Sequence, residues 1–199
     1  LLPSYPAGLS EKARAQLEQI SVTVRTCVLV TDIQPHAVTV RGDDQVETIP
    51  TRTVLWSAGV RASPLGKLLA DAAGVGVDRQ GRVPVEPDLT VPGHPEVFVI
   101  GDLANYAHQT SVPLPGVAPV AMQQGRHVAA SIRRRLAGKT PSPFRYRDYG
   151  TMATIGRARA VAIIGPLRFS GFLAWLAWLF VHLMYLVEFQ NRILVLLQW

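Results

Sequence analysis

The sequence is poor in the side chains that form cross-links and metal centres. Cys27 is the only cysteine among 199 residues, which excludes an internal disulfide, a Cys-x-x-Cys redox pair and a cysteine-rich zinc site. The five histidines are scattered and show no ligand spacing, so we predict no metal. We also name no catalytic side chain from the sequence.

Charge is missing from one long stretch near the C-terminus. The apolar run 171–187 is seventeen residues long and holds no Asp, Glu, Lys or Arg. As a helix it would reach about 25 Å, slightly short of a hydrocarbon core of about 30 Å. A transmembrane span, a buried core helix and an interfacial helix are all compatible with it. The aromatic residues that favour the interface are Trp175, Trp178, Tyr185 and Trp199.

The remaining charges are distributed unevenly. Residues 1–125 hold 9 Lys and Arg against 12 Asp and Glu, whereas residues 126–199 hold 11 against 2, a net charge of +9. A cationic segment beside an apolar run is typical of contact with anionic lipid. No basic helix with interleaved base-reading side chains accompanies it, so we predict no nucleic-acid partner.

The most informative motif is residues 97–102, Val-Phe-Val-Ile-Gly-Asp. Its apolar residues predict a buried strand of a parallel sheet, and Gly101 allows another group to approach the backbone. Asp102 then follows at the carboxyl end of the strand, where open α/β sheets bind their ligands. A carboxylate at this place can accept hydrogen bonds from sugar or ribityl hydroxyls.

Periodicity and turn residues predict alternating short elements. We expect a helix from Leu9 to Ile20 with Ser10 as its N-cap, and a second helix from about Ala118 to Leu136. A turn is predicted at 42–44. The predicted strands are 22–24, 28–31, 36–41, 46–49, 53–56, 144–147, 152–155 and 160–164.

Several of these segments, taken in order, resemble one enzyme family. They are 53–60, 97–102, 117–126, 146–150 and 155–157. As a set they resemble the C-terminal half of a type II NADH dehydrogenase, a single-subunit NADH:quinone oxidoreductase of the FAD-dependent pyridine nucleotide-disulfide oxidoreductase superfamily. The resemblance implies an α/β, Rossmann-like flavoprotein with two dinucleotide-binding domains and an apolar, membrane-associating helical tail.

The Gly-x-Gly-x-x-Gly turns that such flavoproteins use for FAD and NADH do not occur in this sequence. We therefore expect a C-terminal fragment that is inactive alone. In this interpretation residues 1–60 belong to the NADH-binding domain and 61–143 to the FAD-binding domain. Residues 144–199 form a small β segment and the membrane-associating helix.

The resemblance also implies the reaction and its site. The enzyme would oxidise NADH through non-covalent FAD and transfer two electrons to a membrane quinone without pumping protons. The cofactor-binding residues would be Gly101, Asp102, Ala121, Met122 and Gln123. Gln123 and Gln124 would face the quinone, because a neutral amide suits a group whose charge changes. Expected partners are NADH, quinone and membrane lipid, with a homodimer left open, at the cytoplasmic face of a bacterial inner membrane.

Two alternatives stay open. One is a soluble flavin-dependent NAD(P)H reductase of a disulfide or small redox protein, against which the apolar tail and the absence of a His-x-x-x-x-Glu pair argue. The other is a non-catalytic, membrane-associated fragment without flavin. A visible spectrum that shows or lacks flavin bands discriminates between a flavoenzyme and this second alternative.

Overall fold

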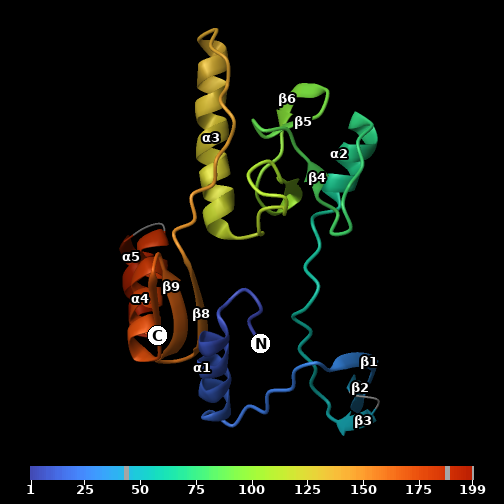
Figure 1. Ribbon diagram of the computed structural model, residues 1–199, viewed down its shortest axis with the longest axis vertical. Helices are drawn as coiled ribbons and strands as arrows, with labels where there is room; N and C mark the ends of the chain where they lie inside the picture. Colours follow the sequence, from blue (N-terminus) through green and yellow to red (C-terminus); the bar gives the residue numbers. More distant parts are fainter. Residues whose placement is uncertain (43–44, 187–188, 199) are drawn as a thin grey trace. The chain divides into compact units, whose positions relative to one another are not determined.

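The computed structural model describes residues 1–42, 45–186 and 189–198 of the chain. The fold is mixed α/β and forms two compact units, which Figure 1 shows in sequence colours. One unit combines Leu1–Leu55 with Tyr149–Trp199, and the other is Trp56–Asp148. The first unit is therefore discontinuous in sequence.

An antiparallel sheet of three strands organises the C-terminal part of the first unit. Its strand order is β10 (Leu167–Ser170), β9 (Arg159–Ile164) and β8 (Thr151–Gly156). The strands predicted at 152–155 and 160–164 are confirmed. Strand β10 was not expected, because its apolar–polar alternation extends over only four residues, which form a strand by pairing with β9.

Helix α1 (Ala7–Glu18) covers one face of this sheet. Its residues Leu9 and Ala13 pack against Val161 of β9, and all three are buried. The helix begins directly after a proline instead of at the predicted N-cap Ser10, whose hydroxyl donates to the Leu2 carbonyl at 3.2 Å. Proline suits a helix start, because the first backbone N–H groups need no intrahelical acceptor.

Helix α4 (Phe172–Tyr185) covers the opposite face of the sheet. Ala160 and Ala162 of β9 pack against Ala174 of the helix, and none of these three alanines is exposed. Alternation along β9 thus sends successive side chains to opposite helices. Because alanine side chains are small, they let the backbones of the helix and the sheet approach each other closely at this interface.

The predicted apolar run 171–187 corresponds to α4 over most of its length, and Val187 lies outside the described residues. Helix α5 (Phe189–Gln198) follows. None of the helices formed by the described residues is long and apolar enough to cross a membrane.

A second antiparallel sheet in the first unit contains β1 (Leu29–Gln34), β2 (Ala37–Gly42) and β3 (Gln45–Pro50) in sequence order. These strands confirm three predictions, although residues 43 and 44 of the predicted turn lie outside the described residues. The predicted strands 22–24 and 53–56 are wrong, since both segments are irregular. β-branched composition alone does not make a strand, which needs a neighbour for its backbone groups.

The second unit is built from short elements around one apolar core. Helix α2 (Leu65–Ala73) packs on β4 (Val83–Pro84), which pairs in parallel with β7 (Ala104–Asn105). Gly66 permits this packing, because a Cβ atom there would lie 2.6 Å from the Gly81 carbonyl oxygen. The buried core residues are Val83, Val85, Leu89, Val91, Val99, Ala104, Tyr106 and Phe144.

The strand predicted over 97–100 differs from expectation in extent and direction. Strand β6 (His94–Phe98) pairs antiparallel with β5 (Thr90–Val91). The chain reverses between them at Gly93, which has a φ of +79°, and so brings β6 back along its immediate predecessor. The predicted parallel sheet at this motif is therefore wrong over the described residues.

Candidate functional site

The candidate site begins where the chain leaves β6. Ile100 is extended, Gly101 has a φ of +67°, and Gly101–Leu103 form the 3₁₀ turn η1. A Cβ atom on Gly101 would lie 3.3 Å from the Cβ atom of Ala121. The turn thus lies directly against helix α3 (Ala118–Leu136). Both this close contact and the positive φ favour glycine at position 101.

Gln124 of α3 joins the helix to this turn. Its Oε1 atom accepts the backbone N–H of Gly101 at 2.7 Å, and the residue is only 1% exposed. The side chain therefore faces the inside of the second unit. This differs from the quinone-facing position expected from the sequence, because Gln124 lies on the buried side of α3.

Asp102 is exposed and carries the carboxylate of the site. A cavity of about 360 Å³ adjoins it. The cavity is lined by Gly59, Val60, Arg61, Ala62, Gln80, Arg82, Asp102 and Gly116. A Cβ atom on Gly116 would lie 3.1 Å from Asp102 Oδ1, so this glycine leaves space beside the carboxylate.

Arg82 forms a fixed cationic part of the cavity wall. Its Nε atom donates to Asp78 Oδ2 at 2.7 Å, and Asn105 Nδ2 donates to the same oxygen at 3.2 Å. Asp78 Oδ1 accepts the backbone N–H groups of Gln80 and Arg82. Burial alone would raise the pKa of Asp78, but these hydrogen bonds and the guanidinium charge hold it below its usual value.

The side chain of Gln123 is hydrogen-bonded to a segment of the chain that returns along the start of α3. Its Nε2 atom donates to the Arg147 carbonyl at 2.9 Å, and its Oε1 accepts the Arg147 N–H at 3.0 Å. Gln109 makes the same two contacts with Tyr146, at 2.9 and 2.8 Å. The two amides thus bind the backbone groups of consecutive residues.

We call residues 144–147 the strap. The sequence predicts a strand here, but over the described residues the strap is irregular and its backbone groups bond to side chains and loops. Phe144 N–H donates to the Pro87 carbonyl at 2.7 Å, and the Tyr106 hydroxyl donates to the Phe144 carbonyl at 2.5 Å. Amide side chains replace the neighbouring strand that a sheet would provide.

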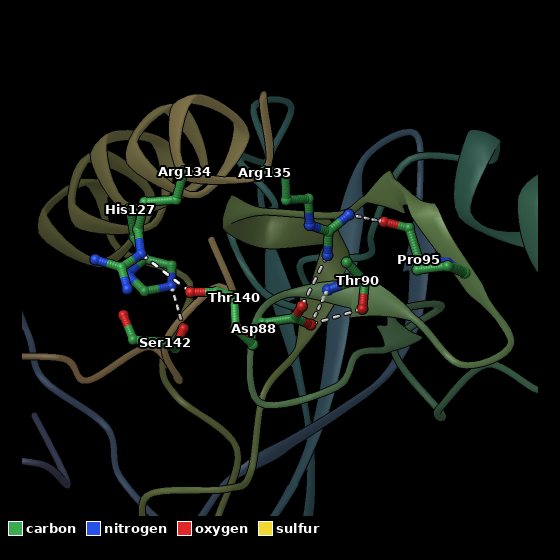
Figure 2. A network of polar contacts seen from close by, with 8 residues as sticks. All are labelled: Asp88, Thr90, Pro95, His127, Arg134, Arg135, Thr140 and Ser142. Carbon is green, nitrogen blue, oxygen red and sulfur yellow. Dashed lines mark hydrogen bonds and ion pairs between the residues drawn. The ribbon is translucent and has the colours of Figure 1, made fainter. Parts of the chain in front are cut away.

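The far end of α3 is tied to two loops, as Figure 2 shows. Arg135 donates to Asp88 Oδ2 at 2.9 Å and to the Pro95 carbonyl. Asp88 Oδ1 also accepts the hydroxyl of Thr90 at 2.6 Å. Burial by itself would raise the pKa of Asp88, but the Thr90 hydrogen bonds and Arg135 lower it below its usual value.

To the left of these contacts in the same view, Arg134 Nε donates to the Thr140 carbonyl at 3.1 Å, and His127 lies 3.0 Å from the Ser142 carbonyl oxygen. The position of α3 is therefore determined at both ends: by Gln124 near its start and by these contacts near its end.

The structure brings together Gly101, Asp102 and Ala121 of the sequence-predicted site. Met122 is partly exposed, and Gln123 is bound to the strap. Sequence reasoning missed Arg82 and its partner Asp78, although an acid–base pair four residues apart is a recognisable local signal. It also missed Gln109, whose partner lies 37 residues away and gives no local signal.

The donor and acceptor groups of the site suit a hydroxylated, anionic ligand. Within the described residues the Asp102 carboxylate accepts no hydrogen bond, so its oxygens are open to hydroxyl donors. Arg61 and Arg82 line the same cavity and carry positive charge. These residues fit the sugar or ribityl and phosphate parts of FAD. The described side chains include no group of three or more His, Cys, Asp or Glu that could hold a metal ion.

Two family models match the chain. Residues 1–125 match the pyridine nucleotide-disulphide oxidoreductase model, and residues 149–199 match the NDH2 C-terminal domain. The sequence resemblance to type II NADH dehydrogenases is thereby confirmed.

Among curated proteins, the chain is 45% identical over 203 residues to the type II NADH:quinone oxidoreductase Ndh of Mycobacterium tuberculosis, covering 100% of this chain and 43% of that protein. It is 34% identical over 165 residues to the type II NADH:quinone oxidoreductase of Staphylococcus haemolyticus, covering 82% of this chain and 40% of that protein. The chain thus spans less than half of the length of these relatives.

Solved structures show the same fold at low identity. NDH2 from Plasmodium falciparum, in complex with NADH, matches 97% of this chain and 54% of that chain with a TM-score of 0.81 and 14% identity. The sulfide:quinone oxidoreductase of Aquifex aeolicus matches 81% of this chain and 40% of that chain with a TM-score of 0.60 and 14% identity. The mixed α/β fold is therefore similar to that of NDH2.

Proposed function

Because the chain belongs to the pyridine nucleotide-disulphide oxidoreductase family, we propose that the protein acts as a type II NADH:quinone oxidoreductase. In this function it oxidises NADH through non-covalent FAD and reduces a membrane quinone with two electrons, without pumping protons. One observation carries the proposal: both family segments occur in order in a chain that is 45% identical, over its whole length, to such an enzyme.

The proposed cofactor residues are Gly101, Asp102, Ala121, Met122 and Gln123. Bound FAD supplies the redox chemistry, as an acceptor of hydride and a donor of electrons. Asp102 accepts hydrogen bonds from ribityl or ribose hydroxyls, which orients the cofactor. Gly101 and Ala121 present little side-chain bulk where the turn meets α3. The N-terminal end of α3 stabilises negative charge on a reduced cofactor through its helix dipole.

Gln123 is the proposed quinone-facing amide. Both of its polar atoms are engaged by Arg147. Quinone contact therefore uses the second lone pair of Oε1, the second N–H of Nε2, or an exchange with the Arg147 backbone. Gln124, which is 1% exposed, contributes through its hydrogen bond to the Gly101 backbone and not through contact with a ligand.

The proposed domain organisation is an NADH-binding part in residues 1–60, an FAD-binding part in 61–143 and a membrane-associating part in 144–199. One observation supports its boundaries. The compact units change between Leu55 and Trp56 and again between Asp148 and Tyr149, close to the proposed boundaries, while residues 1–55 and 149–199 belong to one unit. The Rossmann-like, two-dinucleotide architecture of the whole enzyme follows from the family.

Membrane lipid is a proposed partner of α4 and α5. Both helices expose large apolar side chains, which soluble surfaces avoid in contiguous patches. These side chains are Phe172, Leu173, Leu176, Phe180, Met184, Tyr185, Ile193, Leu194 and Leu197. We place this surface on the cytoplasmic face of a bacterial inner membrane, with monotopic attachment. A homodimer is also proposed, and sedimentation of the full-length protein tests it.

The function is tested in the full-length protein by its visible spectrum and by NADH oxidation with a soluble quinone analogue. We expect flavin absorbance bands and quinone-dependent NADH oxidation. Asp102→Ala should weaken FAD binding by about 1.5–3 kcal/mol, the value of a hydrogen bond to a charged group. The flavin-to-protein ratio after gel filtration measures this loss.

Asp71→Ala is the matched control, because Asp71 is an exposed carboxylate on α2 whose ion pair, among the residues that the structure describes, is with Lys67 at the surface. It should retain FAD like the unmodified protein. Absence of flavin and of NADH oxidation in the full-length protein would contradict the proposed function. Equal FAD retention in the two variants would contradict the role of Asp102 alone.

A further inference from the structure

Gln124 is an unusual side chain for its position. It is 1% exposed and belongs to the largest fully buried side chains of the structure. Burying an amide is unfavourable unless its polar atoms find partners. Valine, leucine or methionine would fill such a position without this penalty, so the amide needs a specific reason.

The reason lies in the backbone of the turn. The Gly101 N–H donates to Gln124 Oε1 at 2.7 Å, a distance typical of a strong hydrogen bond. Because Gly101 adopts a φ of +67° and starts η1, its N–H takes no part in the hydrogen bonds between β5 and β6. Without Gln124 this donor would lose its partner.

Neighbouring residues of α3 also pack against the turn. Ala121 lies one helical turn before Gln124 and contacts Gly101, whereas a Cβ atom on Gly125 would lie 3.7 Å from Ile100 Cδ1. Residues 121, 124 and 125 share one face of the helix, as their spacing of three and four requires. Two of them are small and allow approach, while Gln124 alone supplies a directed bond.

The consequence reaches Asp102, the next residue along the chain. Its exposed carboxylate receives no hydrogen bond from the described residues, so its direction depends on the backbone of η1. We infer that Gln124 is a positioning residue: it holds the Gly101 turn through one hydrogen bond and thereby keeps the Asp102 carboxylate at the cavity. Gln124 acts without touching the cofactor. This inference rests on the proposed function, in which Asp102 binds FAD.

The test compares two substitutions in the full-length protein. Gln124→Met keeps the length and removes the acceptor, and Gln124→Glu keeps an acceptor oxygen. We expect Gln124→Met to weaken FAD binding about tenfold, which corresponds to about 1.4 kcal/mol. Gln124→Glu should stay within about threefold of the unmodified protein, because an oxygen still accepts the Gly101 N–H. Gln16→Met is the control, since Gln16 is a buried glutamine of α1 bonded to the Ala160 carbonyl.

Two further readouts separate positioning from general destabilisation. In a cycle with Asp102→Ala, Gln124→Met should add less than about twofold to the loss of FAD affinity, because both changes affect one element. In flavin-free protein, amide exchange at Gly101 should become about tenfold faster in Gln124→Met and unchanged in Gln16→Met.

Each result has a definite meaning. Equal FAD affinity in Gln124→Met and the unmodified protein would overturn the inference, as would equal losses in Gln124→Met and Gln124→Glu. A full tenfold loss in the Asp102→Ala background would also overturn it. If Gln124→Met does not fold, the FAD affinity of folded Gln124→Glu decides. A loss as large as that of Asp102→Ala would overturn the inference, whereas an affinity within threefold of the unmodified protein would support it. Failure of the unmodified protein to bind FAD contradicts the proposed function, whereas the Gly101 exchange rates still report on the turn.

Discussion

The two units of the molecule achieve order in different ways. The unit Trp56–Asp148 adds to its apolar core a set of polar side chains that bind backbone groups: Gln109, Gln123 and Gln124 alone make five such bonds. The layer formed by α1, β8, β9, β10 and α4 is held instead by small and branched apolar side chains on both faces of a sheet. We call this the helix–sheet layer.

The contrast suggests a division of labour. Directed hydrogen bonds determine where individual backbone atoms lie, which a cofactor site requires. Apolar packing gives stability without fixing single polar atoms, and it leaves the outer face of α4 free to stay apolar. Substitutions should therefore affect overall unfolding most strongly in the helix–sheet layer and local geometry most strongly in the other unit.

The largest effect is expected at Gly150, beside the helix–sheet layer. Its φ is +113°, and a Cβ atom would lie 2.1 Å from the Ile163 carbonyl oxygen, so Gly150→Ala forces the backbone apart. We expect a loss of more than about 3 kcal/mol in the free energy of unfolding. Urea unfolding followed by tryptophan fluorescence measures it.

Gly171→Ala is the matched comparison, because Gly171 has a φ of +79° and no atom within 4 Å of a built Cβ. Only the conformational cost of placing a side chain at this φ and at a ψ of −143° should remain, about 1–3 kcal/mol. Equal losses for both variants would show that crowding by β9 is not what requires glycine at position 150.

The next effect concerns acid stability in the unit Trp56–Asp148. Asp78 and Asp88 have folded-state pKa values below their usual values. Their contribution to the free energy of unfolding is therefore complete above the pKa of the unfolded state, and it disappears as the pH falls through the pKa of the folded state. We expect stability to decrease below about pH 4. Asp88→Asn should cost about 2 kcal/mol at pH 7 and reduce this decrease.

Thermal unfolding at several pH values measures the effect. Asp71→Asn serves as the control, since its carboxylate pairs with Lys67 on an exposed helix surface, where ion pairs contribute little. A steeper acid transition in Asp88→Asn than in the control would contradict the assignment.

A smaller and more local effect is expected in the strap. Gln109→Leu removes the partner of Tyr146, and Gln123→Leu removes the partner of Arg147. Each change should cost about 1 kcal/mol and accelerate amide exchange at its own partner residue. Exchange measured at single-residue resolution distinguishes the two variants. Simultaneous acceleration of both amides in either variant would show that the strap opens as one piece.

The smallest effect on stability is expected on the outer face of α4. Phe180 is 64% exposed, so Phe180→Gln should change the free energy of unfolding by less than about 0.5 kcal/mol. The same substitution should weaken binding to vesicles that contain anionic lipid, because it removes apolar area from the proposed membrane surface. Flotation of the full-length protein measures this. If Phe180→Gln lowers the free energy of unfolding but leaves vesicle binding unchanged, the proposal that the outer face of α4 binds lipid rather than stabilising the fold is contradicted.

Sequence reasoning was most successful where a local pattern coincides with a local interaction. The strands at 36–41, 46–49 and 160–164 follow from short runs rich in β-branched residues, and a helix close to 118–136 follows from its periodicity. The motif at 97–102 drew attention to Gly101 and Asp102, which the structure places in a turn beside α3, although the strand before them is antiparallel.

What the sequence by itself determined is the set of elements with their own periodicity, the family of the chain and the glycine–aspartate turn. Tertiary structure alone decided how neighbouring residues are used. Gln123 and Gln124 have the same side chain, yet one binds the strap and the other the Gly101 N–H. The helix turns by about 100° between adjacent residues, so identical amides face different surroundings. Only the elements packed around α3 decide which backbone group each amide meets.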